Sequence, residues 1–143
     1  MNLYKLLTQR AANDNPVRVG LIGCGKFGTM FLTQAMQTKG LHVVGIADLN
    51  TERAQHNLST AGWDRSRFDA KSLDAAFQSG TTHVGDDAAA LIAYERLDVI
   101  IEATGIPRAG IEHCRRAIHA GHHVVMVSVE ADVVAGPLLA REA

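Results

Sequence analysis

Three glycines and one aspartate have the spacing of a site for the diphosphate and ribose of a dinucleotide. Gly23, Gly25 and Gly28 form the pattern G-x-G-x-x-G between an apolar run and a helical pattern, and Asp48 follows 20 residues after Gly28. Gly23 permits a tight turn, Gly25 has no Cβ to obstruct a pyrophosphate, and Gly28 allows close packing of helix and strand. The spacing therefore predicts dinucleotide binding.

The chemistry of this arrangement is the binding of an anion and a sugar. The first N–H groups of a helix have no intrahelical partner and lie at the positive end of the helix dipole, so they favour a phosphate. Asp48 would accept hydrogen bonds from the ribose hydroxyls and repel a 2′-phosphate, which favours NAD over NADP. Lys26 and Arg53 are near enough in sequence to pair with a phosphate if Asp48 turned away. The competing interpretation is that the glycines only turn the chain and that Asp48 only caps a helix.

A second segment of small residues is expected beside the cofactor. Ala103, Thr104 and Gly105 follow an apolar run, and ligands of open α/β sheets bind outside the carboxyl ends of the strands. This turn should therefore pass beside the nicotinamide end of a dinucleotide, although an ordinary strand-to-helix turn would also explain it. The neighbouring Glu102 is more typical of a satisfied carboxylate than of a catalytic base.

A third segment reaches the same edge of the predicted sheet. Ser128 and Glu130 follow the last apolar run, where they would touch a substrate that lies against the nicotinamide. Helix capping by Ser128 or Asp132 is the competing explanation. Four histidines between positions 113 and 123 do not share one face as paired metal ligands do, so the sequence predicts no metal site. The catalytic residues stay unassigned, because no complete acid/base set is recognisable.

The elements that must position these residues alternate between strand and helix. The strands lack strict polar alternation, as expected for strands that are buried on both faces of a parallel sheet. The predicted fold class is therefore α/β, a doubly wound, mostly parallel sheet of the Rossmann NAD(P)-binding type in a single domain. Strands are expected at 17–22, 41–47, 82–84, 97–103 and 123–129, and helices after Gly25, from Asn50 or Thr51 to Gly62, around 73–77, up to Tyr94, at 107–120 and at 133–141.

Length and composition exclude several classes of protein. The chain has 143 residues, 47% hydrophobic content and a formal net charge of −1, which suits one globular domain and no general nucleic-acid binder. The sequence has no run of 18 apolar residues, so no membrane span is predicted, and the first 15 residues do not resemble a secretory signal. Two cysteines favour a cytoplasmic location over a disulfide framework.

The chain is expected to divide into a short leading segment and one domain. Residues 1–16 should form a helix with a leucine stripe, made of Leu3, Leu6 and Leu7, and a connector, and residues 17–143 the dinucleotide-binding domain. The leucine stripe is expected to pack against this domain or a partner.

Longer stretches of the chain resemble a known family, the homoserine-dehydrogenase-like NAD(P)-dependent oxidoreductases. The similar segments are VRVGLIGCGKFGTMF, LHVVGIADLN and LDVIIEATGIPRAGIEHCRRAIHAGHHVVMV. The similarity extends to the subgroup described as 1-deoxy-D-xylulose-5-phosphate-reductoisomerase-like, whose members often carry a C-terminal SAF domain. It covers nearly the whole chain, and the ATG turn and the VEAD segment are more specific than the glycine pattern.

The resemblance implies an NAD(P) site, and this chain differs from the family in two respects. Homoserine dehydrogenases have an Asn-Lys pair where this chain has Ser128-Val129, which weakens a claim to homoserine chemistry. Family members continue into a substrate-binding and oligomerisation domain, so this chain is expected to be the cofactor half without the substrate domain. The implied cofactor-binding residues are Gly23, Gly25, Lys26, Phe27, Gly28, Asp48, the adjoining Leu49, Ala103, Thr104 and Gly105.

Two functions fit these observations. The first is the NAD(P)-binding domain of an oxidoreductase that transfers a hydride between the nicotinamide and a carbonyl or alcohol of a small polar metabolite, phosphorylated or not. The alternative is a stand-alone Rossmann module that senses a nucleotide without catalysis. Under either function the partner is a dinucleotide, and a substrate would bind only with the second domain. Homo-oligomerisation stays open, and this chain alone is expected to bind without turnover.

Overall fold

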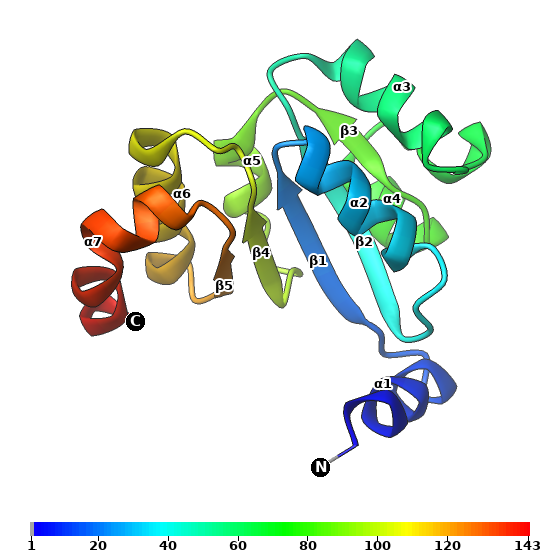
Figure 1. The fold of residues 1–143 in the computed structure, drawn as a ribbon. Helices are drawn as coiled ribbons and strands as arrows, with labels where there is room; N and C mark the ends of the chain where they lie inside the picture. The colour runs from blue at the N-terminus through cyan, green and yellow to red at the C-terminus, as the bar shows by residue number, and fades with distance from the viewer. Residues whose placement is uncertain (1) are drawn as a thin grey trace.

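Parallel strands form the centre of the structure, a computed structural model that describes residues 2–143 (Figure 1). In this part of the chain there are five strands, which are β1 (Val17–Ile22), β2 (Leu41–Ala47), β3 (His83–Gly85), β4 (Val99–Glu102) and β5 (His123–Met126). Their order in the sheet is β3-β2-β1-β4-β5, and every neighbouring pair is parallel. The order of the strands reverses at β1, so the carboxyl ends of β1, β2 and β4 meet at one edge of the sheet.

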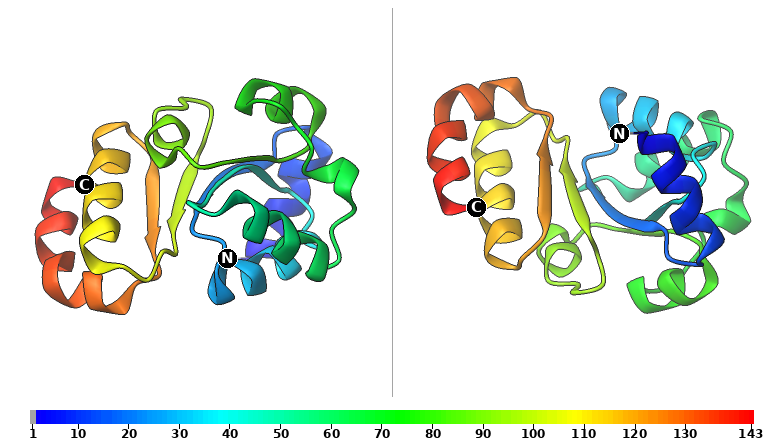
Figure 2. Two further views of the ribbon diagram at one scale, coloured as in Figure 1. Left: turned by 90° about the horizontal axis from the view of Figure 1, so that it is seen from above. Right: turned by 90° about the horizontal axis from the view of Figure 1, so that it is seen from below.

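Helices cover both faces of this sheet, as the predicted doubly wound fold requires. One core cluster joins α2 (Lys26–Ala35) and α3 (Thr51–Thr60) to the sheet, and the other joins α4 (Leu73–Ser79), α5 (Ala88–Ile92) and α6 (Pro107–His119) to it. In β1, Val19 and Leu21 face the first cluster and Ile22 faces the second, which is the alternation of a strand that is buried on both sides. The last helix, α7 (Val129–Glu142), lies beside α6 at the β5 end of the sheet (Figure 2).

The boundaries confirm most of the predicted elements. The strands predicted at 17–22 and 41–47 have the predicted bounds, and the helix after Asp48 begins at Thr51, with Asn50 as its N-cap. The strands predicted at 97–103 and 123–129 are shorter: the first covers only Val99–Glu102 and the second only His123–Met126.

The start of the last helix is the largest correction. A helix was predicted from residue 133, but α7 begins at Val129. The cause is Ser128, whose extended backbone and side-chain oxygen cap the helix by accepting a hydrogen bond from the Ala131 N–H at 3.3 Å. Two acidic residues in the first turn of α7 also favour a helix start at this point.

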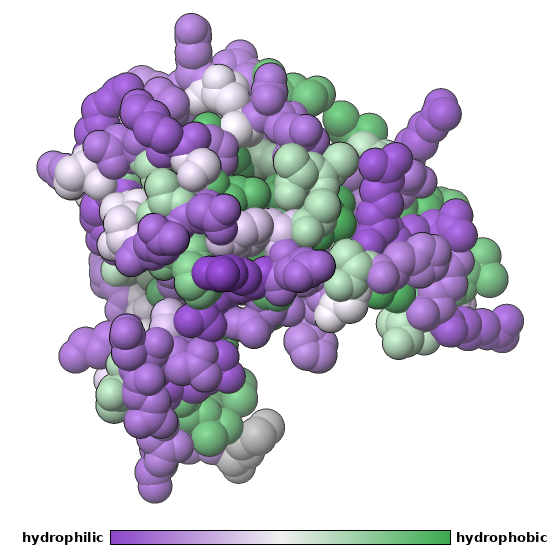
Figure 3. All heavy atoms as spheres, turned by 180° about the vertical axis from the view of Figure 1, so that it is seen from behind, coloured by the Kyte–Doolittle hydropathy of each residue, from purple (hydrophilic) through white to green (hydrophobic). Residues whose placement is uncertain are grey.

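The predicted N-terminal helix forms with its leucine stripe largely exposed on this domain, so packing of the stripe against a partner stays a prediction. This helix, α1 (Leu3–Ala12), has no buried residue within the described part of the chain, and 64% of Leu3 is exposed. It projects from the rest of the domain, whose rear surface is mostly hydrophilic with hydrophobic patches between polar side chains (Figure 3). An ion pair of 3.7 Å between Arg10 and Asp98 links the helix to the segment before β4. None of the helices described combines the length and apolar character that crossing a bilayer requires.

Leu58 on α3 provides a test of the core. Its side chain is fully buried between α3 and the sheet, so Leu58→Ala should lower the free energy of unfolding by about 2–5 kcal/mol in a urea titration. The matched variant is Leu138→Ala on α7, where 60% of the residue is exposed and the loss should stay below about 0.5 kcal/mol. Similar losses in both variants would contradict this packing of α3.

Candidate functional site

The glycine turn connects β1 to α2, and its three glycines have different surroundings. Gly23 has a φ of +92°, and a Cβ on it would lie 2.7 Å from the carbonyl of Ala103. A Cβ on Gly28 would collide with the carbonyl oxygen of Gly23, as expected if this glycine allows helix and strand to pack closely. A Cβ on Gly25 would meet no atom within 4 Å. The turn thus needs Gly23 and Gly28 for its own packing, whereas Gly25 leaves open space above the backbone.

The amino end of α2 is open at this point. Gly25 is its N-cap and provides no side chain to bind the first N–H groups, and the first turn contains no acidic residue. The carbonyl of Gly25 accepts hydrogen bonds from the backbone N–H and the hydroxyl of Thr29, at 2.9 and 2.8 Å. A hollow of about 520 Å³ adjoins this end and is lined by Gly25, Lys26 and Arg53, among others. An anion could therefore reach the first N–H groups of the helix.

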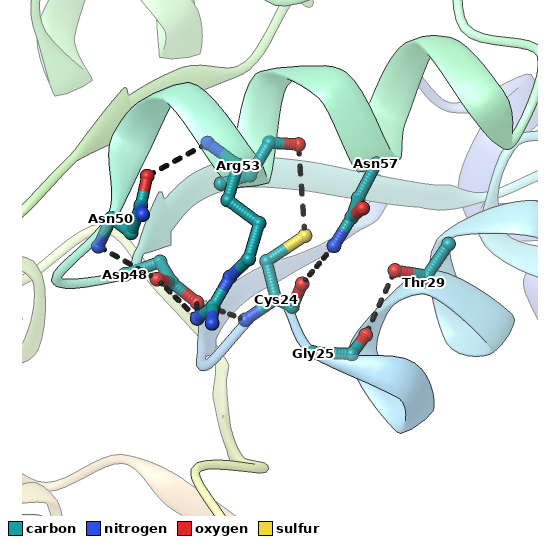
Figure 4. A network of polar contacts seen from close by, with 8 residues as sticks. Cys24, Gly25, Thr29, Asp48, Asn50, Arg53 and Asn57 are labelled. Atoms are coloured by element: carbon teal, nitrogen blue, oxygen red, sulfur yellow. Dashed lines mark hydrogen bonds and ion pairs between the residues drawn. The ribbon is translucent and has the colours of Figure 1, made fainter.

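Asp48 joins the end of β2 to the glycine turn (Figure 4). Its Oδ2 accepts a hydrogen bond from the Cys24 N–H at 2.8 Å, and its Oδ1 accepts one from the Asn50 N–H at 2.8 Å. The Arg53 guanidinium lies 3.0 Å from Oδ1 and 3.3 Å from Oδ2. A buried carboxylate needs partners of this kind, since an unpaired charge would be strongly destabilising.

These contacts change the expected state of Asp48. The sequence predicts a carboxylate that faces the ribose, and the structure shows one whose oxygens already accept four hydrogen bonds from three donor nitrogens. The side chain of Asp48 is 5% exposed, whereas that of Arg53 is 57% exposed. Arg53 is therefore the partner that can leave with the least disturbance, because the other donors are backbone groups. The sequence indicates Arg53 only as an alternative partner of a phosphate and does not predict this ion pair.

Cys24 lies inside the same network but is not a reactive thiol. Burial, and then the negative charge of Asp48, raise the pKa of its thiol to about 11. The carbonyl of Cys24 accepts a hydrogen bond from the Asn57 side chain at 2.7 Å, and its Sγ lies 3.9 Å from the carbonyl oxygen of Ala54. The thiol is therefore neutral at pH 7, and Cys24 serves to hold the turn against α3.

A crevice of about 220 Å³ opens at the carboxyl ends of β1, β2 and β4. It brings together Gly23, Asp48, Leu49 and Thr104 among the predicted residues, and Ala103 lies directly against Gly23. Gly25 and Lys26 line the neighbouring hollow, and Phe27 and Gly105 are exposed outside the crevice. Asp86 and His113 also line the crevice, although no motif in the sequence distinguishes them.

The remaining candidates lie around this crevice. Oε1 of Glu102, a fully buried residue, accepts hydrogen bonds from the N–H and the hydroxyl of Thr104, at 3.2 and 2.5 Å. Ser128 is buried as the N-cap of α7, which is the competing explanation that the sequence left open, and Glu130 is exposed. Neither Ser128 nor Glu130 lines the crevice, so their contact with a substrate stays a prediction. Residues 2–143 contain no group of three side chains placed to hold a metal ion.

The comparison with known families now identifies the class of protein. Residues 17–126 match the sequence pattern of the oxidoreductase family with an NAD-binding Rossmann fold, GFO_IDH_MocA. The chain belongs to this family, and the predicted class of NAD(P)-binding Rossmann domain is confirmed. The family match does not distinguish NAD from NADP.

Individual relatives share the fold over part of their length. A homoserine dehydrogenase from Thiobacillus denitrificans superposes with a TM-score of 0.68 at 20% identity, over 90% of this chain and 27% of that chain. Biliverdin reductase from Synechocystis sp. PCC 6803, in complex with biliverdin and NADP+, superposes with a TM-score of 0.67 at 21% identity, over 90% of this chain and 34% of that chain. The 1-deoxy-D-xylulose 5-phosphate reductoisomerase of Rhodopirellula baltica is 43% identical over 61 residues, which are 42% of this chain and 13% of that protein. This chain thus spans a third or less of most of these relatives.

The raised pKa of Cys24 predicts a loss of stability at alkaline pH. The thiol ionises near its ordinary pKa in the unfolded chain but only at about 11 in the folded one, so between these values the unfolded state binds fewer protons. The free energy of unfolding should therefore fall by about 2–3 kcal/mol between pH 9 and pH 11. Urea titrations of Cys24→Ala should lack this part of the decline, and an identical pH profile in both proteins would contradict the burial of the thiol.

Proposed function

We propose that this domain holds the dinucleotide of an oxidoreductase that moves a hydride between NAD(P) and a carbonyl or alcohol of a small polar metabolite. The observation that supports this most is the open space at Gly25, beside an α2 amino end without any capping side chain. A pyrophosphate fits this place, because a Cβ on Gly25 would fill it and, among residues 2–143, no side chain caps the first N–H groups of α2.

The rest of the dinucleotide follows from this position. The adenosine ribose would lie over Asp48 and Leu49, and Lys26 would add a positive charge beside the pyrophosphate. The nicotinamide half would extend across β1 toward Ala103, Thr104 and Gly105. When bound, the cofactor supplies the hydride chemistry, and the residues of this domain bind and orient it.

The substrate is proposed to be a polar, phosphorylated metabolite that binds with a second domain. The 61-residue similarity to a 1-deoxy-D-xylulose 5-phosphate reductoisomerase supports a phosphorylated substrate. Ser128 and Glu130 follow β5 and stay the candidates for contact with it, Glu130 because its side chain is exposed.

For the cofactor, we infer a preference for NAD that Arg53 weakens. The carboxylate of Asp48 is fixed by two backbone N–H groups, so a 2′-phosphate would meet a negative charge that cannot turn away. Arg53 is held on the other side by its ion pair with Asp48 and is more than half exposed. It can leave Asp48 to the ribose hydroxyls of NAD, and it can contact a 2′-phosphate and offset part of the repulsion.

Gly25→Val tests the position of the pyrophosphate. The new side chain would project into open space, so circular dichroism and the unfolding midpoint should stay close to those of the original protein. Binding of NADH and NADPH, followed by their fluorescence, should be lost, because the valine would occupy the place of the diphosphate. The matched variant Thr33→Val lies farther along α2 in the same hollow and should bind both cofactors normally. Normal binding by Gly25→Val would contradict the proposed function.

Asp48→Asn and Arg53→Ala test the cofactor preference in opposite directions. Asp48→Asn should weaken NAD binding by about tenfold or more and NADP binding by less, since the ribose hydroxyls lose a charged acceptor while a 2′-phosphate also loses a repulsive neighbour. Arg53→Ala should weaken NADP binding more than NAD binding, because only the 2′-phosphate needs the guanidinium. Calorimetric titrations of both variants would measure the ratios, and equal weakening of NAD and NADP by each variant would exclude this arrangement.

A further inference from the structure

Glu102 and His113 form a pair on the β4 side of the crevice that the proposed function does not yet use. Glu102 ends β4 and its side chain is fully buried, and His113 lies on α6 with its side chain 19% exposed. The His113 Nδ1 is 3.4 Å from Oε1 of Glu102. Because a carboxylate oxygen accepts and does not donate, this contact requires the proton on Nδ1.

The other carboxylate oxygen of Glu102, Oε2, indicates that this side chain does more than hold Thr104 in the turn after β4. Within the described chain Oε2 is buried without a hydrogen-bond partner, which is costly for a carboxylate. It lies against α6 at Gly110, where a Cβ would come within 2.9 Å of Oε2. A glycine at this position therefore leaves the space that the carboxylate needs to reach His113.

His113 lines the crevice, and the second nitrogen of its ring is open to a ligand. Nε2 has no hydrogen-bond partner in residues 2–143 and is not among the buried unpartnered atoms, so it reaches solvent. His113 on α6 lines the crevice together with Thr104, which follows β4. With the proton held on Nδ1, Nε2 is a hydrogen-bond acceptor.

The charges around the crevice select the kind of group that Nε2 would meet. Asp48 and Asp86 line the same crevice, and Glu102 contacts the histidine ring. Arg53 also lines the crevice, but its charge is paired with Asp48. The carboxylates outnumber this one guanidinium, so a phosphate would be repelled near His113, whereas a neutral hydroxyl can donate to Nε2. The sugar nearest to β4 in the proposed arrangement is the ribose of the nicotinamide half.

We propose that His113 accepts a hydrogen bond from a hydroxyl of the nicotinamide-side ribose, with Glu102 as the residue that positions its ring. This assignment rests on the proposed function, since it takes the pyrophosphate to lie at Gly25. It adds a contact for the second sugar, which neither the glycine pattern nor Asp48 supplies.

Three ligands of increasing length separate the two proposals. ADP carries the diphosphate and one ribose, ADP-ribose adds the second ribose, and NAD adds the nicotinamide. In calorimetric titrations of the whole chain, His113→Ala should weaken ADP-ribose and NAD by about tenfold and leave ADP within about twofold, since one hydrogen bond is lost. His119→Ala is the control on the same helix, where the side chain is 65% exposed, and should bind all three ligands normally.

The outcomes of this experiment are distinct. Equal weakening of ADP by His113→Ala, or unchanged binding of ADP-ribose and NAD, would overturn the assignment of His113 while leaving the proposed function intact. Failure of the unmodified chain to bind ADP and NAD would overturn the proposed function and this assignment with it.

The positioning by Glu102 has its own readout. Nitrogen chemical shifts of His113 in nuclear magnetic resonance spectra should show the proton on Nδ1 in the unmodified chain. Glu102→Gln and Gly110→Ala should both move it toward Nε2 and reproduce the selective loss for ADP-ribose and NAD, because the first removes the charge and the second displaces the carboxylate. A proton on Nε2 in the unmodified chain would overturn the proposal without any variant.

Discussion

The hydrogen bond from the Cys24 N–H to the Asp48 carboxylate, 2.8 Å long, holds the whole site together. It joins the turn after β1 to the end of β2, at the place where the order of the strands reverses. Because the carboxylate is buried, it cannot remain unpaired, and two of its donors are backbone groups that the strand ends fix in place. The amino end of α2 and the crevice are therefore arranged by the fold itself, which lowers the cost of ordering them around a ligand.

A second constraint is the approach of Gly23 to the end of β4. The missing Cβ of Gly23 lets the turn lie against the carbonyl of Ala103, so the glycine turn and the 103–105 turn share one boundary of the crevice. The N–H and the hydroxyl of Thr104 then donate hydrogen bonds to Oε1 of Glu102, which hold Thr104 in place. The two sides of the crevice are thus connected through backbone contacts around Gly23, and a change at that residue would disturb both.

The sequence predicts the parts of this architecture that depend on continuous local patterns. The strands at 17–22 and 41–47 are mostly apolar runs with one polar residue each, Arg18 and His42, and the glycine spacing locates the turn between β1 and α2. The end of β5 was misjudged because Val127 and Val129 continue its apolar pattern, while the cap at Ser128 starts a helix. The ion pair of Arg53 with Asp48 and the contact of His113 with Glu102 could not be predicted, because they depend on how side chains from separate elements are packed.

The distribution of charge around the crevice explains how one edge of a sheet can bind both phosphates and sugars. On one side the open end of α2, Lys26 and Arg53 provide positive potential next to Gly25. On the other side the crevice contains the carboxylates of Asp48 and Asp86, with Glu102 buried behind it. In the proposed arrangement a diphosphate is therefore stabilised at the helix end, and the neutral sugars on either side of it meet acceptors. This division favours one position of the dinucleotide along the edge, because a shift toward the crevice would bring the diphosphate against the carboxylates of Asp48 and Asp86.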